Sequence, residues 1–284
     1  MKRLKTGFSV FFVIALVFGL AACSGGGASS DSGAGSSASI DYGASYLEGI
    51  KEKGTLVVGC DPTIQNIAYM DDAGNVTGFI PDLVGGYAEQ LGVEVKWEVL
   101  EWSAMITALN SGKVDMVAAN MNMTLERESQ ILLSDCWLLD HAMACVLKDS
   151  SFQTFEDLQA AGVKFGVTQG SAYEDIIRDT FPNAEIVTLS AGTWQDSLIS
   201  GIIDAAYDDG VVFAGPVTSN DQLRILEETG DAYMDGFAFA AGNYVPRDTF
   251  NLYLTKLKVT GVYADIYSEW MGFDWKPESQ GASF

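Results

Sequence analysis

The sequence predicts an α/β protein of two lobes, in which mainly parallel sheets carry helices on both faces. Strand and helix patterns alternate from Thr55 onward, and such alternation favours parallel sheets covered by helices. The alternation comes in two runs, one before about Leu139 and one after Phe152, and the 284 residues leave room for two cores. Because ligands of open α/β sheets bind beyond the carboxyl ends of strands, we expect the site in the loops that follow them.

The first run combines two kinds of apolar pattern. Residues 93–99 alternate apolar and charged side chains, which predicts a half-buried strand. Apolar residues recur at helical spacing after Asp82 and stop at Gly92, which predicts a helix ended by glycine. Ser103 is expected to cap the next helix. The elements expected in this run are strands at 56–58, 93–99 and 114–119 and helices at 82–91 and 104–110.

The second run repeats the order of strand and helix. It predicts strands at 163–167, 186–189 and 203–207 and helices at 172–180 and 193–200. The last third adds a strand at 237–241 and helices at 248–260 and 263–271. The loops after the predicted strands hold Asp61, Trp102 and residues 120–127, 169–172 and 208–209.

The N-terminus has the pattern of an export signal. Three basic residues within the first five precede an apolar run over 8–22, which is shorter than the roughly 20 residues of a membrane span. The run ends in small residues before Cys23, as in bacterial lipoproteins, so we expect removal of 1–22 and acylation of Cys23, for example with palmitate. Residues 23–45, rich in Gly, Ser and Ala, predict a flexible tether. The alternative is an ordinary leader with an incidental cysteine.

The composition excludes several classes of function. The chain has 38 Asp and Glu against 16 Lys and Arg, and it lacks the basic stripe that nucleic-acid or polybasic membrane binding needs. Cys60, Cys136 and Cys145 form no CxxC pair, and with one histidine in the chain we expect no metal and no other cofactor. These cysteines are interpreted as small buried residues. A Cys136–Cys145 or Cys60–Cys136 disulfide is the alternative, because export permits oxidation.

Eight short motifs occur in a fixed order between about residues 50 and 275. They are GTLVVG at 54–59 with Asp61-Pro62, GFIPDL at 78–83, LNSGKVD at 109–115, MNMTLER at 121–127, LSD at 133–135, GVTQGS at 166–171, IDA at 203–205 with Asp208-Asp209, and a closing segment from GVY at 261–263 to EWMG at 269–272. In this order they resemble the amino-acid-type (family 3) periplasmic solute-binding proteins of ABC importers.

The resemblance implies a two-lobed periplasmic-binding-protein fold of type II, with crossing strands between the lobes and a ligand cleft between them. Lobe 1 is then expected at 46–140 and 236–275, lobe 2 at 141–235, and a C-terminal tail at 276–284. The implied protein is a monomer outside the cytoplasm, anchored to the cell membrane through lipidated Cys23. It would capture a polar amino acid by clamshell closure and deliver it to an ABC permease and its ATPase, without enzymatic activity or catalytic residues.

The resemblance also assigns residues to the charged ends of an amino acid. Arg127 matches the arginine that binds the carboxylate, and its planar fork can donate two parallel hydrogen bonds. Backbone N–H groups of 170–172, where a helix begins, are expected to favour the same carboxylate. Asp209 and the carbonyl of Asn120 match acceptors for the ammonium group. Read alone, Arg127 could be a solvated arginine at a helix start, and Asp209 could belong to a surface acid pair with Asp208.

The side-chain end of the ligand is less defined. Trp102 matches an aromatic wall and Asp61 an acid that contacts the side chain, although a core tryptophan and a turn-forming acid are the alternatives. Ile64 replaces the second aromatic of many relatives, and Asn122 replaces their Ser or Thr, so the specificity stays open. The residues expected to bind ligand are Asp61, Ile64, Trp102, Asn120, Met121, Asn122, Arg127, Gly170, Ser171, Ala172 and Asp209.

Three other classes of protein are weighed against this interpretation. Some dehydratases share the fold, and Glu174 lies near a suitable loop. The sequence, however, has no hydroxyl–histidine–acid order, HExxH motif or phosphate-binding loop, and its single His141 is expected to be structural. A receptor ectodomain would need a membrane span after Trp275, which we do not expect, and a surface adhesin would not need a charge-matched cleft. A binding protein for another small charged solute is the remaining alternative.

Overall fold

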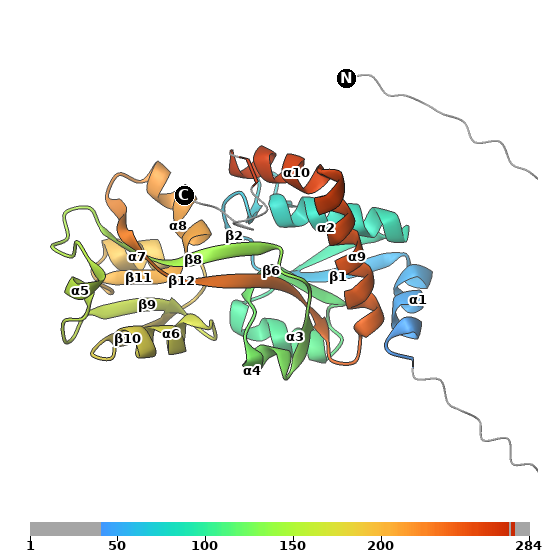
Figure 1. Cartoon of the computed structure of the whole chain (residues 1–284), viewed down its shortest axis with the longest axis horizontal. Coiled ribbons are helices and arrows are strands. Elements are labelled where there is room, and N and C mark those ends of the chain that lie inside the picture. Colours follow the sequence, from blue (N-terminus) through green and yellow to red (C-terminus); the bar gives the residue numbers. More distant parts are fainter. Residues whose placement is uncertain (1–40, 273, 276–284) are drawn as a thin grey trace, which may run out of the picture. The chain divides into compact units, whose positions relative to one another are not determined.

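The structure, a computed structural model, describes residues 41–272 together with 274 and 275 (Figure 1). The predicted signal peptide, Cys23, the tether up to residue 40 and the tail at 276–284 lie outside the described residues. Helix α1 (Ala44–Lys53) begins inside the segment predicted as tether, so its last two residues are helical. None of the helices in the described part is long and apolar enough to cross a membrane.

A mixed nine-stranded sheet runs through the described part of the chain. Its order is β10-β9-β11-β8-β12-β6-β1-β5, and β7 also pairs with β12. Strand β1 is parallel to β5 and β6 at one end, and β9 is parallel to β10 and β11 at the other, which gives two parallel groups. The strands are β1 Thr55–Cys60, β5 Glu94–Val99, β6 Met116–Asn122, β7 Ile131–Leu133, β8 Leu138–Leu147, β9 Lys164–Thr168, β10 Glu185–Leu189, β11 Ala205–Asp209 and β12 Leu223–Ala240.

Two long antiparallel strands, β8 and β12, join the two parallel groups (Figure 1). Strand β12 pairs with β6 and β7 on the side of the first lobe, while β8 pairs with β11 on the side of the second. Asp140 of β8 lies opposite Tyr233, and Asp235 of β12 lies opposite Leu138. The fold is therefore the expected two-lobed α/β fold with strands that cross between the lobes.

Helices cover both parallel groups. In the first lobe, α2, α9 and α10 lie on one face of the sheet and α3 lies on the other (Figure 1). A small antiparallel sheet of β2 (Thr63–Ile64), β3 (Ala68–Met70) and β4 (Val76–Thr77) lies between β1 and α2 in the chain. The remaining helices are α2 Phe79–Leu91, α3 Met105–Asn110, α4 Leu125–Glu128, α5 Phe155–Leu158, α6 Tyr173–Thr180, α7 Trp194–Ile199, α8 Gly210–Ser219, α9 Tyr244–Thr260 and α10 Val262–Met271.

Each lobe has its own aromatic core. In the first lobe the Trp137 ring stacks on Phe237 with centroids 5.5 Å apart, and both side chains are fully buried. In the second lobe Phe165 stacks on Phe181 at 4.6 Å, and Tyr207 meets Phe181 edge to face. Aromatic pairs of this kind stabilise a core by about 0.5–1.5 kcal/mol beyond the burial of their surface.

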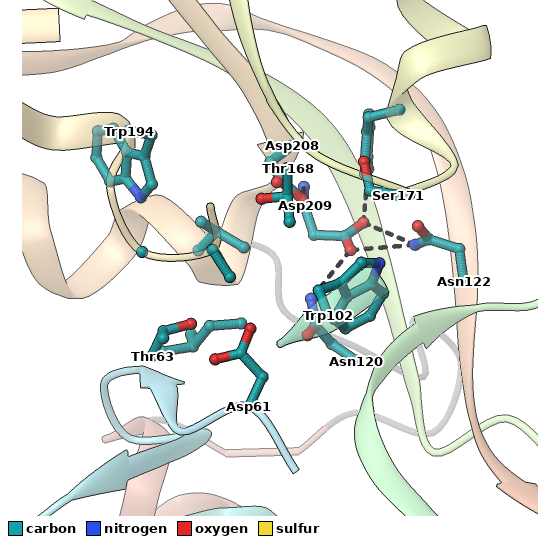
Figure 2. Close-up of a pocket in the computed structure, with 15 residues that line it drawn as sticks. Asp61, Thr63, Trp102, Asn120, Asn122, Thr168, Ser171, Trp194, Asp208 and Asp209 are labelled. Atoms are coloured by element: carbon teal, nitrogen blue, oxygen red, sulfur yellow. Dashed lines mark hydrogen bonds between the residues drawn. The ribbon is translucent and has the colours of Figure 1, made fainter. Parts of the chain in front are cut away.

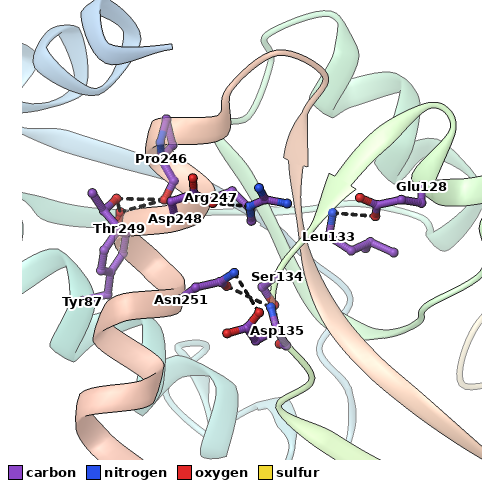
Figure 3. A network of polar contacts seen from close by, with 10 residues as sticks. All are labelled: Tyr87, Glu128, Leu133, Ser134, Asp135, Pro246, Arg247, Asp248, Thr249 and Asn251. Atoms are coloured by element: carbon purple, nitrogen blue, oxygen red, sulfur yellow. Dashed lines mark hydrogen bonds and ion pairs between the residues drawn. The ribbon is translucent and has the colours of Figure 1, made fainter. Parts of the chain in front are cut away.

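Polar contacts fix helix α9 to the rest of the first lobe (Figure 3). Asn251 of α9 exchanges two hydrogen bonds with Asp135, in the loop between β7 and β8. The Tyr87 hydroxyl of α2 pairs with the Thr249 hydroxyl of α9 at 2.8 Å. These bonds join segments more than 110 residues apart in the chain, and α9 directly follows β12, so they hold the end of a crossing strand in place.

The elements differ from the sequence predictions in several details, among them one helix start, one helix cap and one strand. Helix α2 begins at Phe79 rather than Asp82, because Pro81 is tolerated in a first helical turn, where N–H groups lack partners in any case. Ser103 does not cap a helix: it lies inside a 3-10 turn, Trp102–Ala104, that leads directly into α3. The predicted strand at 237–241 is the end of the 18-residue β12.

The three described cysteines are free thiols. Cys60 and Cys145 are fully buried, as expected of small core residues. Cys136 is only partly buried, which corrects that expectation, and its thiol donates to the carbonyl of Leu138 at 3.0 Å. Burial raises the pKa of the Cys60 and Cys145 thiols to about 12.

Candidate ligand-binding site

A cavity of about 520 Å³, part of it open to solvent, lies between the two lobes. Its walls come from the segments that follow β1, β5, β9 and β10 and from the ends of β6 and β11, as the strand-end rule predicts (Figure 2). The lining residues are Asp61, Thr63, Ile64, Trp102, Asn120, Asn122, Thr168, Ser171, Tyr173, Ala191, Gly192, Trp194, Asp208, Asp209 and Val212.

Asp209, at the end of β11, is the most enclosed acid of this lining, with 1% of its surface exposed. Its carboxylate accepts hydrogen bonds from the Asn120 amide at 3.3 Å, the Asn122 amide at 3.1 and 3.2 Å, and the Tyr173 hydroxyl at 2.6 Å (Figure 2). The two asparagines belong to the first lobe and Tyr173 to the second. Burial raises the pKa of Asp209, and the Tyr173 hydroxyl and the two amides counteract that rise. Asp209 is therefore a buried acid rather than one member of a surface acid pair with Asp208.

Arg127 is buried, with 7% of its surface exposed, in the short helix α4. The Thr124 side chain caps this helix by accepting from the Arg127 backbone N–H at 3.2 Å. One guanidinium nitrogen donates to the Asn122 carbonyl at 2.9 Å and another to the Gly170 carbonyl of the second lobe at 3.4 Å. The guanidinium carbon lies 5.7 Å from the centre of the Trp102 ring. Arg127 is thus not a solvated surface arginine, and it lies behind the lining rather than in it.

Two of the three backbone N–H groups of the segment 170–172, which the sequence suggested as free donors, already have acceptors within the second lobe. The Gly170 N–H donates to the Glu174 side chain at 2.9 Å, and the Ser171 N–H donates to the Thr168 carbonyl at 3.0 Å. Glu174 lies in the first turn of α6, where an acidic side chain is favoured by free N–H groups. The Ser171 hydroxyl, by contrast, lines the cavity and has no hydrogen-bond partner.

Seven of the eleven expected residues line the cavity, and Arg127 lies next to it. The Met121 side chain belongs instead to a buried cluster with Met105 and Leu133, because alternate residues of β6 face opposite sides of the sheet. Gly170 accepts from the Trp102 indole at 3.3 Å, which closes one side of the cleft. Ala172 is not part of the lining. Asn120 contributes its side-chain amide, whereas the sequence suggested its carbonyl.

Sequence reasoning missed several lining residues of the second lobe, most notably Trp194. This tryptophan begins α7 and meets Phe213 edge to face at 4.9 Å, and it also lines the cavity. It supplies an aromatic wall on the second lobe, whereas the sequence analysis considered aromatic walls only at Trp102 and at the position of Ile64, both on the first lobe. Trp194 closely follows β10, so the strand-end rule could have found it.

A group of buried acids lies beneath the cavity. Asp140 of β8 accepts from the backbone N–H groups of His141 and Val211, each at 2.8 Å. Burial and the charge of Asp209 raise the pKa of Asp140 to about 7. Asp235 of β12 accepts from the Asn122 amide at 3.1 Å through one oxygen, while its other oxygen has no hydrogen-bond partner. Burial and then the charges of the neighbouring acids, Asp209 first, raise the pKa of Asp235 well above its usual range.

No group of three or more His, Cys, Asp and Glu residues in the described part of the chain is arranged to hold a metal ion. His141 is exposed, and its ring nitrogen Nδ1 lies 3.3 Å from the Gly230 carbonyl. The cavity therefore presents carboxylates, amides, hydroxyls and indole rings as its binding groups.

Comparison with known proteins identifies the family. Residues 56–273 match the family model of the bacterial extracellular solute-binding proteins, family 3. The chain belongs to this family. Among curated family members, it is 28% identical over 232 residues to the L-cystine-binding protein TcyJ of Escherichia coli (strain K12), covering 80% of this chain and 86% of TcyJ.

Two solved structures extend the family relationship to the fold. An ancestral arginine-binding protein bound to arginine is 32% identical, with a TM-score of 0.72, and the match covers 77% of this chain and 99% of that protein. The ancestral amino acid-binding protein AncCDT-1, described as a precursor of cyclohexadienyl dehydratase, is 30% identical, with a TM-score of 0.74 over 79% of this chain and 99% of its own. Family 3 membership supports a solute-binding role.

Proposed function

We propose that this family 3 protein captures a polar amino acid between its lobes and delivers it to the permease and ATPase of an ABC importer. The observation that carries the proposal is Asp209. This buried carboxylate lies in the interlobe cavity and is held by groups from both lobes, and buried Arg127 lies behind the same cavity. An amino acid presents one ammonium and one carboxylate group, and a closed cleft must pair both charges because an unpaired buried charge is costly.

Binding would exchange contacts that the protein makes with itself. The ligand ammonium group would replace amide or hydroxyl donors at Asp209, and it would add the positive charge that this buried acid lacks. The ligand carboxylate would replace the backbone carbonyl of Gly170 at the guanidinium of Arg127, with the Ser171 hydroxyl close by in the lining. Charge-assisted hydrogen bonds are roughly twice as strong as neutral ones, so both exchanges favour the bound, closed cleft.

Two substitutions test this assignment by isothermal titration calorimetry on the full chain, with a screen of the twenty amino acids and their deaminated analogues. Arg127→Ala is expected to lose about 2–5 kcal/mol of binding free energy, roughly 30- to several-thousand-fold in Kd. Asp209→Asn is expected to weaken amino acids far more than their deaminated analogues. Arg247→Ala is the matched control, since this arginine pairs with Asp248 at the start of α9 (Figure 3) and is expected to leave Kd unchanged.

The result that would overturn the proposal is equally specific. Unchanged affinity in Arg127→Ala would remove its carboxylate role, and equal losses for both ligand classes in Asp209→Asn would remove its ammonium role. A chain that binds only deaminated solutes would be a receptor for another charged solute.

Anchoring at the membrane through a lipid on Cys23 is a separate part of the proposal. It rests on the basic, apolar and small-residue segments that precede Cys23. Wild-type chain is expected in the membrane fraction with the mass of attached acyl chains. Cys23→Ala is expected to lose both, and retention of the acyl mass in that variant would refute the assigned site.

A further inference from the structure

The cavity holds two carboxylates that the ends of an amino acid leave without a partner. Asp209 is assigned to the ammonium group, which leaves Asp61 and Asp208 in the lining. No Lys, Arg or His belongs to that lining, and the nearby Arg127 is assigned to the ligand carboxylate. The side-chain end of the cavity therefore holds two carboxyl groups, and its lining supplies no cation to either of them.

The surroundings of both acids, Asp61 and Asp208, favour the binding of a cation beside them. Asp61 follows β1, and burial raises its pKa to about 6, with the Thr63 hydroxyl acting against the rise and Glu101 adding to it. One Asp208 oxygen accepts from the Asp209 backbone N–H at 2.9 Å. Burial and the charge of Asp209 raise the pKa of Asp208 well above its usual range. Each carboxylate would be stabilised in its ionised form by a nearby cation.

The geometry of the cavity adds a second, independent feature. Figure 2 shows Asp61 and Thr63 on one side of the cavity and Asp208 and Asp209 on the other, with the Trp102 and Trp194 rings beside the space between them. Indole rings attract cations, and by more when the cation is shielded from water. Each lobe thus contributes one acid and one indole ring to this end of the cavity. The first lobe supplies Asp61 and Trp102, and the second supplies Asp208 and Trp194.

We infer that the captured solute is an amino acid with a cationic side chain, whose ammonium or guanidinium group lies between Asp61 of the first lobe and Asp208 of the second. This inference rests on the proposed function. A cation at this place bridges the lobes at the side-chain end, in the same way that Asp209 and Arg127 bridge them at the other end. Recognition of the side chain would then itself favour closure of the cleft.

The same cavity disfavours the other amino-acid classes. A neutral side chain, such as that of glutamine, would leave both acids without a counter-charge. Cystine carries a second ammonium group at its far end, but also a second carboxylate, for which the lining offers no cation. The curated relatives include proteins named for cystine, arginine, glutamine and histidine, so family membership alone does not select among them.

The test compares ligands of the same shape and different charge on the full chain at pH 7.5. Arginine is paired with citrulline, which replaces the guanidinium by a neutral urea group, and lysine is paired with norleucine. Glutamine and cystine complete the set. We expect arginine or lysine to bind at least about thirtyfold more tightly than its neutral partner, the low end of the loss seen for a truncated buried charge pair.

Two variants locate the charge effect. Asp61→Asn and Asp208→Asn are each expected to reduce the preference for the cationic partner at least about tenfold, in line with a lost buried charge pair. Asp72→Asn is the matched control, because Asp72 is exposed in the turn between β3 and β4 and lies outside the lining. An unchanged preference in both pocket variants would overturn the roles of Asp61 and Asp208.

A pH titration of ligand binding uses only the wild-type chain, so its result does not depend on whether a variant folds. Because the pKa of free Asp61 is about 6, affinity for the cationic ligand is expected to fall as the pH drops through 6, while affinity for its neutral partner is expected to stay flat. Parallel pH profiles would overturn the inference.

The outcomes separate this inference from the proposed function. If citrulline, glutamine or cystine binds as tightly as the cationic amino acids, the side-chain inference is wrong and amino-acid capture stands. If no amino acid binds, both fail.

Discussion

Replacement of Asp235 by asparagine tests the most unusual electrostatic feature of the fold. Asp235 is fully buried on the crossing strand β12, and one of its carboxylate oxygens has no hydrogen-bond partner. Burial and the charges of Asp209, Asp140 and Asp208 raise its pKa well above the usual 3.8. The native carboxyl therefore keeps a proton at pH values at which the unfolded one has lost it.

The sign of the effect follows from this proton. An acid whose pKa is higher in the folded state stabilises the fold below its unfolded pKa, and this contribution is lost as the pH rises. Each pH unit over which the native carboxyl keeps its proton costs about 1.4 kcal/mol relative to the unfolded chain. Asparagine has the same shape and needs no proton. Asp235→Asn is therefore expected to gain stability over the wild type as the pH rises from 5 to 7, by up to about 1.4 kcal/mol for each pH unit.

The assay is urea denaturation followed by tryptophan fluorescence at pH 5, 6 and 7, on ligand-free chain. The difference in unfolding free energy between Asp235→Asn and wild type should rise with pH, whatever its value at pH 5. Asp72→Asn, at an exposed position, is expected to show no such rise. A difference that is flat, or that falls with pH, would show that Asp235 is ionised in the native state and would refute the reasoning.

Two further predictions concern single side chains. Trp194→Ala is expected to raise the Kd of the captured amino acid by about tenfold or more, since it removes an aromatic wall of the cavity. Trp270→Ala, whose indole donates to Asp82 on the first lobe, is the control; equal effects in calorimetry would deny Trp194 a binding role. Iodoacetamide at pH 8 is expected to label the partly buried Cys136 before the fully buried Cys60 and Cys145, as read by mass spectrometry of peptides. If Cys136→Ser takes up as much label as the wild type, the label is not on Cys136 and the order is wrong.

The aromatic wall of the second lobe shows where sequence patterns stop being informative. The alternation at residues 93–99 and the glycine stop at Gly92 are local signals, and the structure forms a strand and a helix end there. Trp194 gives no such signal, because a tryptophan at a helix start can face a core or a cavity. Only the packing of α7 on Phe213 decides that the Trp194 ring contacts the core at Phe213 and also lines the cavity.

The long strand β12 is a second case. Its apolar end was predicted at 237–241, but the preceding acidic stretch at 227–231 does not alternate, and the pairing with β8 shifts register there. Pairing with the neighbouring strand β8 stabilises this part of β12, and no alternation of apolar and polar residues marks it as a strand. The sequence therefore could not show how far the crossing strands extend.

The sequence by itself determined the alternation of strands and helices, the order of the motifs, and the residue types placed at strand ends, Arg127 and Asp209 among them. These are local properties, since periodicity and turn chemistry involve neighbours in the chain. The tertiary structure decided which distant groups meet: Asn122 donates to both Asp209 and Asp235, 87 and 113 residues away. It also placed the backbone carbonyl of Gly170 against Arg127, where free N–H groups had been expected. Such contacts depend on how two lobes close around crossing strands, and no pattern of neighbouring residues encodes that directly.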